Sequence, residues 1–150
     1  MVRASAILLC CVFLIIPAAQ ADFADGAQAF DGGDYGTAFD EWIKLAETGD
    51  VTAQVAIAGM YRAGTGRRVD VGKSAHWYKK AAFAGDAVAQ MNLGEMYQHG
   101  WGVKRDPVMA YRWYDRAAVQ GKQWAVDQRD ALANTLSADQ ISTARKGIRN

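Results

Sequence analysis

The sequence predicts an all-α protein, a short α-solenoid of antiparallel helix pairs that ends in a C-terminal capping helix. Three observations support this fold class. Residues 50–85 and 86–121 align without a gap and are identical at 13 of 36 positions, and a fixed period of this length is typical of stacked repeats. Apolar residues recur at helical spacing in both halves of each period. No stretch alternates apolar and polar residues as a half-buried strand would.

Each repeat is predicted to form two helices. In the first half of 86–121, four apolar residues follow the spacing i, i+4, i+7 and i+8, which places them on one helix face: Ala89, Leu93, Met96 and Tyr97. The second half repeats this spacing with another four: Ala110, Tyr114, Ala117 and Ala118. Large side chains alternate with alanine along these faces, so neighbouring helices can pack at the density of a protein interior.

Glycine and aspartate mark the ends of the predicted helices. Gly64 and Gly100 each follow a first helix, where a left-handed C-cap favours glycine because it has no Cβ. Asp70 and Asp106 precede the second helices as N-cap residues. Pro107 then occupies the first helical position, where proline is tolerated.

Shorter units flank the two repeats. Residues 22–49 form a degenerate first unit, and residues 122–150 form a half repeat followed by a capping helix that opens with a capping box at Ser137 and Gln140. The inward face of the first unit consists of Phe39, Trp42, Leu45 and Ala46. The predicted helices cover residues 23–31, 35–48, 51–63, 71–84, 87–99, 107–120, 122–134 and 138–148. Terminal repeats of a solenoid are usually atypical because their outer face meets water.

One set of residues in the second repeat carries a specific resemblance: Ala89-Gln90, Leu93-Gly94, Met96-Tyr97, Gly100-Trp101-Gly102-Val103, Asp106, Ala110, Trp113-Tyr114, Ala117-Ala118 and Gly121. The pattern resembles the Sel1-like repeat, a relative of the tetratricopeptide repeat. The first repeat departs from it at two positions. Ala58 replaces the glycine of the Leu-Gly pair, which implies a slightly wider helix contact, and Arg67 replaces the valine of the loop, which implies a loop less anchored in the core.

The N-terminal residues 1–21 resemble a secretory signal peptide. Arg3 supplies a positive charge, residues 6–16 are apolar, and Ala19-Gln20-Ala21 predicts cleavage after Ala21. An uncleaved anchor is the alternative, but the apolar run over residues 4–19 is shorter than the roughly 20 residues that span a bilayer. Cys10 and Cys11 lie in the middle of this run, which disfavours a lipoprotein. The expected location is therefore the periplasm or the outside of the cell.

The composition of the predicted mature chain bears on its stability and on its partners. Removal of residues 1–21 leaves 129 residues with 16 basic and 16 acidic side chains and no cysteine. The fold must then be stable without disulfides. A chain without net charge has no electrostatic preference for nucleic acid or for an anionic membrane, and no stable membrane insertion is expected after cleavage.

The sequence offers no catalytic, cofactor-binding or metal-binding set. His76 and His99 have no partner at ligand spacing, and a metal site needs more ligands than these. No serine nucleophile motif is present, and both cysteines leave with the signal peptide. The glycines on either side of Trp101 follow a helix rather than a strand, so a turn is favoured over a phosphate loop.

Two groups of residues are candidates for binding a partner. The first comprises polar positions on the first helices, which line the inner curve of related arrays: Gln54, Arg62, Asn92, Glu95, Gln98 and His99. The second is Trp101, whose counterpart is Thr65, so that the repeat itself does not require an aromatic ring there. Either Trp101 is an exposed interface anchor, or its ring folds back over Met96 or Tyr97.

The resemblance implies a non-catalytic scaffold or adaptor of the bacterial cell envelope, which binds a protein or peptide on its concave face. The alternative is an envelope enzyme or ligand-binding protein of the type that interacts with β-lactams or peptidoglycan. The cysteines of that subgroup are absent from the mature chain, which argues against it. A third possibility is an accessory repeat unit of a larger envelope complex.

Overall fold

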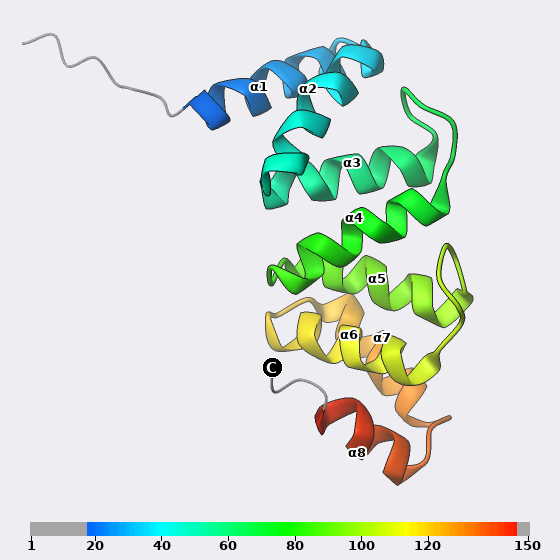
Figure 1. Cartoon of the computed structure of the whole chain (residues 1–150). Helices are drawn as coiled ribbons and strands as arrows, with labels where there is room; N and C mark the ends of the chain where they lie inside the picture. Colours follow the sequence, from blue (N-terminus) through cyan, green and yellow to red (C-terminus); the bar gives the residue numbers. More distant parts are fainter. Residues whose placement is uncertain (1–17, 147–150) are drawn as a thin grey trace, which may run out of the picture.

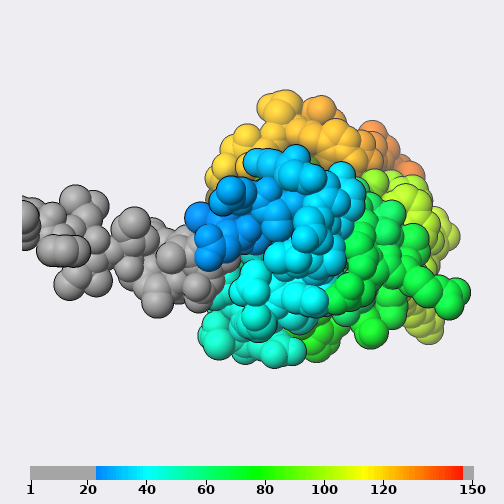
Figure 2. All heavy atoms as spheres, turned by 90° about the horizontal axis from the view of Figure 1, so that it is seen from above, coloured from blue at the N-terminus to red at the C-terminus, as the bar shows by residue number. Residues whose placement is uncertain are grey.

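The computed structural model describes residues 18–146, with side chains from Phe23 onward, and this part of the chain is helical without strands. The helices are α1 (Ala18–Asp31), α2 (Tyr35–Thr48), α3 (Val51–Ala63), α4 (Val71–Phe83), α5 (Ala87–His99), α6 (Pro107–Val119), α7 (Gln123–Ala133) and α8 (Ala138–Lys146). From α1 to α7 each helix packs against the next one in the chain, and α8 packs against α6 (Figure 1). Figure 2 shows from above how α1 and α2, in blue and cyan, cover the N-terminal end of the stack. This arrangement is the predicted short helical solenoid.

The helix boundaries agree closely with the predicted ones. The helices predicted at 35–48, 51–63 and 87–99 have the predicted bounds, while α1 begins at Ala18 instead of residue 23. The capping helix reaches Lys146, and residues 147–150 lie outside the described part. Residues 1–17 of the predicted signal peptide also lie outside it, so cleavage after Ala21 stays a prediction.

Aspartate caps fix where the paired helices begin. Asp70 accepts a hydrogen bond from the Lys73 backbone N–H, and Asp106 accepts one from Met109. Each carboxylate satisfies an N–H group that has no partner inside the helix and lies at the positive end of the helix dipole. Hydrogen bonds from the side chain and backbone of Thr37 hold the pKa of the Asp34 carboxyl below its ordinary value. The predicted caps are confirmed.

Equivalent residues of the two repeats have matching surroundings. Trp77 and Trp113 are both buried, 7% and 2% exposed. Each indole carries a cation over its ring from the residue three positions later: the Lys80 amine lies 4.4 Å from the Trp77 ring centre, and the Arg116 guanidinium lies 5.0 Å from that of Trp113. A cation held over an indole adds to the burial of that ring. The repeat inferred from the sequence is thus also a structural repeat.

Arg67 anchors its loop at the surface rather than in the core. Its counterpart Val103 packs against the hydrophobic core, whereas Arg67 is exposed, in agreement with a loop less anchored there. The Arg67 guanidinium lies 4.4 Å from the ring centre of Phe39 and forms an ion pair with Asp40. Both partners belong to α2, so a cation–π contact and an ion pair connect the loop to the second helix of the preceding unit.

The last helix closes the C-terminal end of the stack by packing against α6. Ser137 and Gln140 form the predicted capping box, because each side chain accepts a hydrogen bond from the backbone N–H of the other. Arg112 of α6 donates from Nε to the carbonyl of Ala144 at 3.0 Å and from Nη2 to that of Thr143 at 3.3 Å. Arg112 thereby satisfies carbonyls near the C-terminal end of α8 that the helix itself leaves free.

Candidate interaction site

Three of the predicted binding residues meet in one cluster. Arg62, in the last turn of α3, donates from Nη1 to the Asn92 side-chain oxygen at 3.0 Å and to Glu95 Oε2 at 2.8 Å. Asn92 is oriented by its own amide, which donates to the Val88 carbonyl at 2.8 Å. The cluster therefore connects α3 to α5 across the boundary between the two repeats.

A surface hollow of about 260 Å³ lies beside this cluster. Its lining residues come from the three first helices α3, α5 and α7: Arg62, Met91, Asn92, Glu95 and Trp124. We call the surface shared by these helices the first-helix face and this cavity the Trp124 hollow. It combines hydrogen-bonding groups with a thioether and an indole, the mixture of apolar lining and few polar groups that is typical of ligand sites.

Met91 and Trp124 line this site but were not among the predicted binding residues, and Trp124 is the larger and more exposed of the two. Its side chain is 43% exposed, and its ring stands edge-on to that of Tyr114 with 5.5 Å between the centres. A signal for it existed, since Trp124 follows Val88 by one period and Val88 follows Thr52 by another. The register therefore placed an indole at an outward position of the half repeat.

Gln54 does not belong to the binding surface, which corrects its prediction. The side chain is buried, and its amide donates to the Ala46 carbonyl at 3.1 Å. Its counterpart Gln90 is buried in the same way and donates to the Ala82 carbonyl at 3.1 Å. This glutamine joins each first helix to the end of the helix before it, so its role is structural.

Gln98 does not line the hollow but bonds to a buried tyrosine. Its side-chain oxygen accepts a hydrogen bond of 2.7 Å from the hydroxyl of the fully buried Tyr114. Burial raises the pKa of the Tyr114 phenol well above its ordinary value, and the Glu95 carboxylate adds to the rise. Burial also raises the pKa of Tyr78, and the charge of Glu95 opposes that of Arg62 there. Both phenols therefore stay protonated and neutral beneath the ion pair.

His99 and Trp101 form a separate aromatic pair. Their rings stack with 4.7 Å between the centres and an angle of 24°, and Trp101 is 44% exposed. The indole is therefore exposed and lies on the imidazole of His99. Neither residue lines the Trp124 hollow, so this pair is separate from the cluster of Arg62, Asn92 and Glu95.

Two further observations bear on chemistry. Within residues 18–146 we find no group of three or more His, Cys, Asp or Glu side chains that could hold a metal ion.

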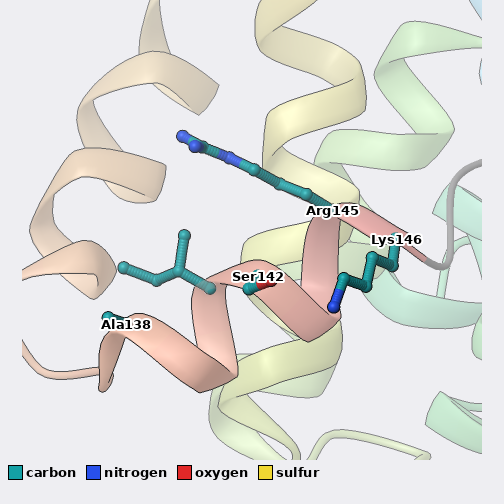
Figure 3. Close-up of a pocket in the computed structure, with 5 residues that line it drawn as sticks. Ala138, Ser142, Arg145 and Lys146 are labelled. Atoms are coloured by element: carbon teal, nitrogen blue, oxygen red, sulfur yellow. The ribbon is translucent and has the colours of Figure 1, made fainter.

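A second hollow, of about 460 Å³, is lined by α8 alone: Ala138, Ile141, Ser142, Arg145 and Lys146 (Figure 3). Its Arg145 already donates to the Tyr111 hydroxyl at 3.0 Å. Because this surface borders residues outside the described part, we place no site there.

No helix in the described residues has the length and apolarity needed to cross a membrane.

Comparison with known proteins identifies a family and its structures. The family model described as "Sel1 repeat" matches residues 51–86 and 87–122. A Sel1 repeat protein from Oxalobacter formigenes is 35% identical, with a TM-score of 0.70 over 75% of this chain and 88% of that one. A protective antigen of uropathogenic Escherichia coli that displays an SLR fold is 31% identical, with a TM-score of 0.79 over 85% of this chain. The chain spans only 28% of that antigen. No curated protein matches the sequence.

Proposed function

Because the chain belongs to the Sel1 repeat family, whose repeats generally serve as interaction modules, we propose that it is a non-catalytic scaffold for protein–protein interaction. A protein or peptide partner binds on the first-helix face, with the Trp124 hollow at the centre of the contact. Stacked helix pairs commonly present such an elongated surface to a partner.

One observation carries this proposal: three successive first helices each contribute a side chain to the same hollow. Arg62 comes from the end of α3, Glu95 from α5 and Trp124 from the start of α7. Tryptophan and arginine are the residues most enriched at the energetic centres of interfaces. A large indole that is 43% exposed contributes less to folding than a buried one, which favours a role in binding.

The proposed location is the bacterial cell envelope, either in the periplasm or outside the cell. It rests on the predicted signal peptide at residues 1–21. The similar protein from E. coli is described as a protective antigen, a property that suits a protein outside the cytoplasm.

Site-specific photocrosslinking in intact cells tests the proposed function. A photoreactive amino acid at Val88, an exposed residue whose carbonyl accepts a hydrogen bond from Asn92 of the Trp124 hollow, is expected to give a discrete crosslinked product. The same residue at His76, exposed on the second helix α4, is the control and is expected to give none. Trp124→Ala should remove the Val88 product while leaving the amount of protein unchanged. Equal products from both positions, or a Val88 product that persists in Trp124→Ala, would contradict the proposal.

A second measurement distinguishes the proposed scaffold from the envelope enzyme that the sequence left as the alternative. Hydrolysis of a chromogenic β-lactam by the purified mature protein at catalytic rates would favour that alternative over a scaffold. We expect no hydrolysis above the rate of the buffer.

A further inference from the structure

We propose that the Trp124 hollow binds an uncharged, extended peptide segment. The Arg62–Glu95 pair forms hydrogen bonds with the backbone N–H and C=O of one residue, and Trp124 contacts an adjacent apolar side chain. This inference rests on the proposed function and adds the chemistry of the partner to it.

The ion pair still has free hydrogen-bonding capacity. Arg62 uses only Nη1 for Asn92 and Glu95. Among the described residues, its N–H groups on Nε and Nη2 have no acceptor, and Glu95 Oε1 has no donor. The Arg62 side chain is 42% exposed and that of Glu95 is 25% exposed, so both remain accessible. A donor and an acceptor lie side by side at the rim of the hollow.

Such a donor and acceptor complement the backbone of one extended residue. In a hydrogen-bonded pair of antiparallel strands, a single residue uses both its N–H and its C=O toward the same neighbour. Arg62 can donate to that C=O while Glu95 accepts from that N–H. The polar part of the site therefore selects an extended backbone rather than a particular side chain.

The charges of the site disfavour a charged partner residue at this point. Arg62 Nη1 lies 2.8 Å from Glu95 Oε2, so the two charges neutralise each other. An incoming carboxylate would compete with Glu95 for Arg62 and be repelled by Glu95, and an incoming ammonium would meet the same opposition from Arg62. A neutral peptide group keeps the pair intact and uses the hydrogen-bonding groups that it leaves free.

The apolar part of the hollow accommodates one side chain. Met91 and Trp124 line it beside the polar cluster, and its volume is about 260 Å³. Methionine and tryptophan present polarisable apolar surface that adapts to aliphatic and aromatic groups. A leucine, methionine or phenylalanine next to the bound backbone residue fits this lining.

The test uses defined peptides and the mature protein labelled with ¹⁵N. Three equimolar libraries of blocked nonapeptides share randomised neutral flanks and carry Leu, Asp or Lys at the centre. The readout is the indole N–H resonance of Trp124, assigned with Trp124→Phe. We expect the Leu library to shift this resonance, with the Asp and Lys libraries at least about tenfold weaker and binding by the Leu library changing little with added salt.

Two arginine substitutions distinguish the loss of the Arg62 hydrogen bonds from the loss of one positive charge. Arg62→Gln introduces the residue found one repeat later, at Gln98. It should lower the affinity for the Leu library by about tenfold, the loss expected for a hydrogen bond to a charged group. Arg68→Gln removes an exposed arginine outside the hollow and should change nothing. N-methylation of the peptide bonds on both sides of the central residue should weaken binding as much as Arg62→Gln does.

Preference for the Asp or Lys library, or no shift of Trp124 with the Leu library, would overturn the inference. If the protein with tryptophan at position 124 still gives the Val88 crosslink in that case, the proposed function stands and only the partner chemistry is wrong. Loss of both results would remove the first-helix face as a binding surface altogether.

Discussion

Gly102 lies so close to the backbone carbonyl of Val71 that a Cβ at position 102 would overlap with it. Val71 is the first residue of α4, one repeat before the loop that carries Gly102. Gly66 has the same relationship to Tyr35, the first residue of α2. The second glycine of each loop thus allows the loop to pack against the backbone of the preceding repeat.

The contact between Gly102 and Val71 predicts an unequal effect of two alanine substitutions. Both Gly102 and Gly121 have positive φ angles, 67° and 82°, but nothing lies within 4 Å of a Cβ at Gly121. Gly121→Ala should therefore lower the free energy of unfolding by about 1–2 kcal/mol, the cost of a left-handed alanine. Gly102→Ala should cost roughly 1–3 kcal/mol more because of the overlap. Urea unfolding of both variants measures the difference, and equal losses would show that the loop moves away freely.

A buried amide oxygen predicts a stabilising substitution at Ala84. Gln90 Oε1 accepts a hydrogen bond of 2.9 Å from Gln120, whereas Gln54 Oε1 has no partner in the described residues. Ala84 is the counterpart of Gln120, with a similar backbone: φ −73° and ψ −5° against φ −88° and ψ 13°. Ala84→Gln should supply the missing donor and raise the free energy of unfolding by about 1 kcal/mol.

Ala84→Met is the matched control for that substitution, because it adds similar volume without an amide. The reverse change, Gln120→Ala, should lower stability by about 1–3 kcal/mol because it leaves Gln90 Oε1 buried without a donor. Thermal unfolding of the three variants under one set of conditions tests the set. Equal stabilisation by glutamine and methionine would attribute the gain to packing alone.

Three tyrosines, two buried and one partly buried, predict a loss of stability in alkali. Burial raises the pKa values of Tyr78, Tyr97 and Tyr114 above the ordinary value for tyrosine. Above a pH of about 10 the unfolded chain releases phenol protons that the folded chain retains, so the free energy of unfolding falls as pH rises. Their contribution is fully present below that pH. Tyr114 alone can contribute up to about 1.4 kcal/mol per pH unit.

Urea unfolding between about pH 8 and pH 11 measures this slope. Tyr114→Phe should reduce the slope above a pH of about 10, although it also lowers stability at neutral pH by removing the hydrogen bond to Gln98. An unchanged slope in this variant would mean that Tyr114 titrates as an exposed phenol does.

The hydrogen bonds from Arg112 to α8 predict that this residue stabilises the capping helix. Arg112→Ala removes the hydrogen bonds to the carbonyls of Thr143 and Ala144 and should lower stability by about 1.5–3 kcal/mol, as expected for bonds from a charged donor. Arg112→Lys keeps the charge but loses the two-pronged geometry, so it should restore only part of this loss. Hydrogen exchange should become faster in α8 and stay unchanged in α3. Unaltered protection of α8 would show that packing of Ala144 suffices.

Local sequence rules predicted most of the fold. The positions of Asp70 and Asp106 fixed the starts of α4 and α6 because an N-cap depends only on the next few residues. Gly64 and Gly100 ended α3 and α5 for a similarly local reason, and both have left-handed backbones. The apolar spacing of each helix then identified its buried face.

The binding surface was less predictable. Gln54 and Arg62 lie on the same helix and both are polar, yet one is buried and the other is exposed. The difference arises from the preceding helix, whose Ala46 carbonyl accepts from Gln54. The sequence did not predict a binding role for Trp124, because that role depends on Met91 and Glu95 lining the same hollow. Both residues lie more than one helix away from Trp124 in the chain.

By itself the sequence determined the period, the helix ends and the core, because backbone preferences and apolar spacing act within a single helix. Only the tertiary structure decided that Arg62 meets Glu95, that Trp124 lines their hollow and that α8 packs on Arg112. These contacts depend on the angle and distance between neighbouring helices, which arise from the packing of the whole stack and are not encoded in any one segment.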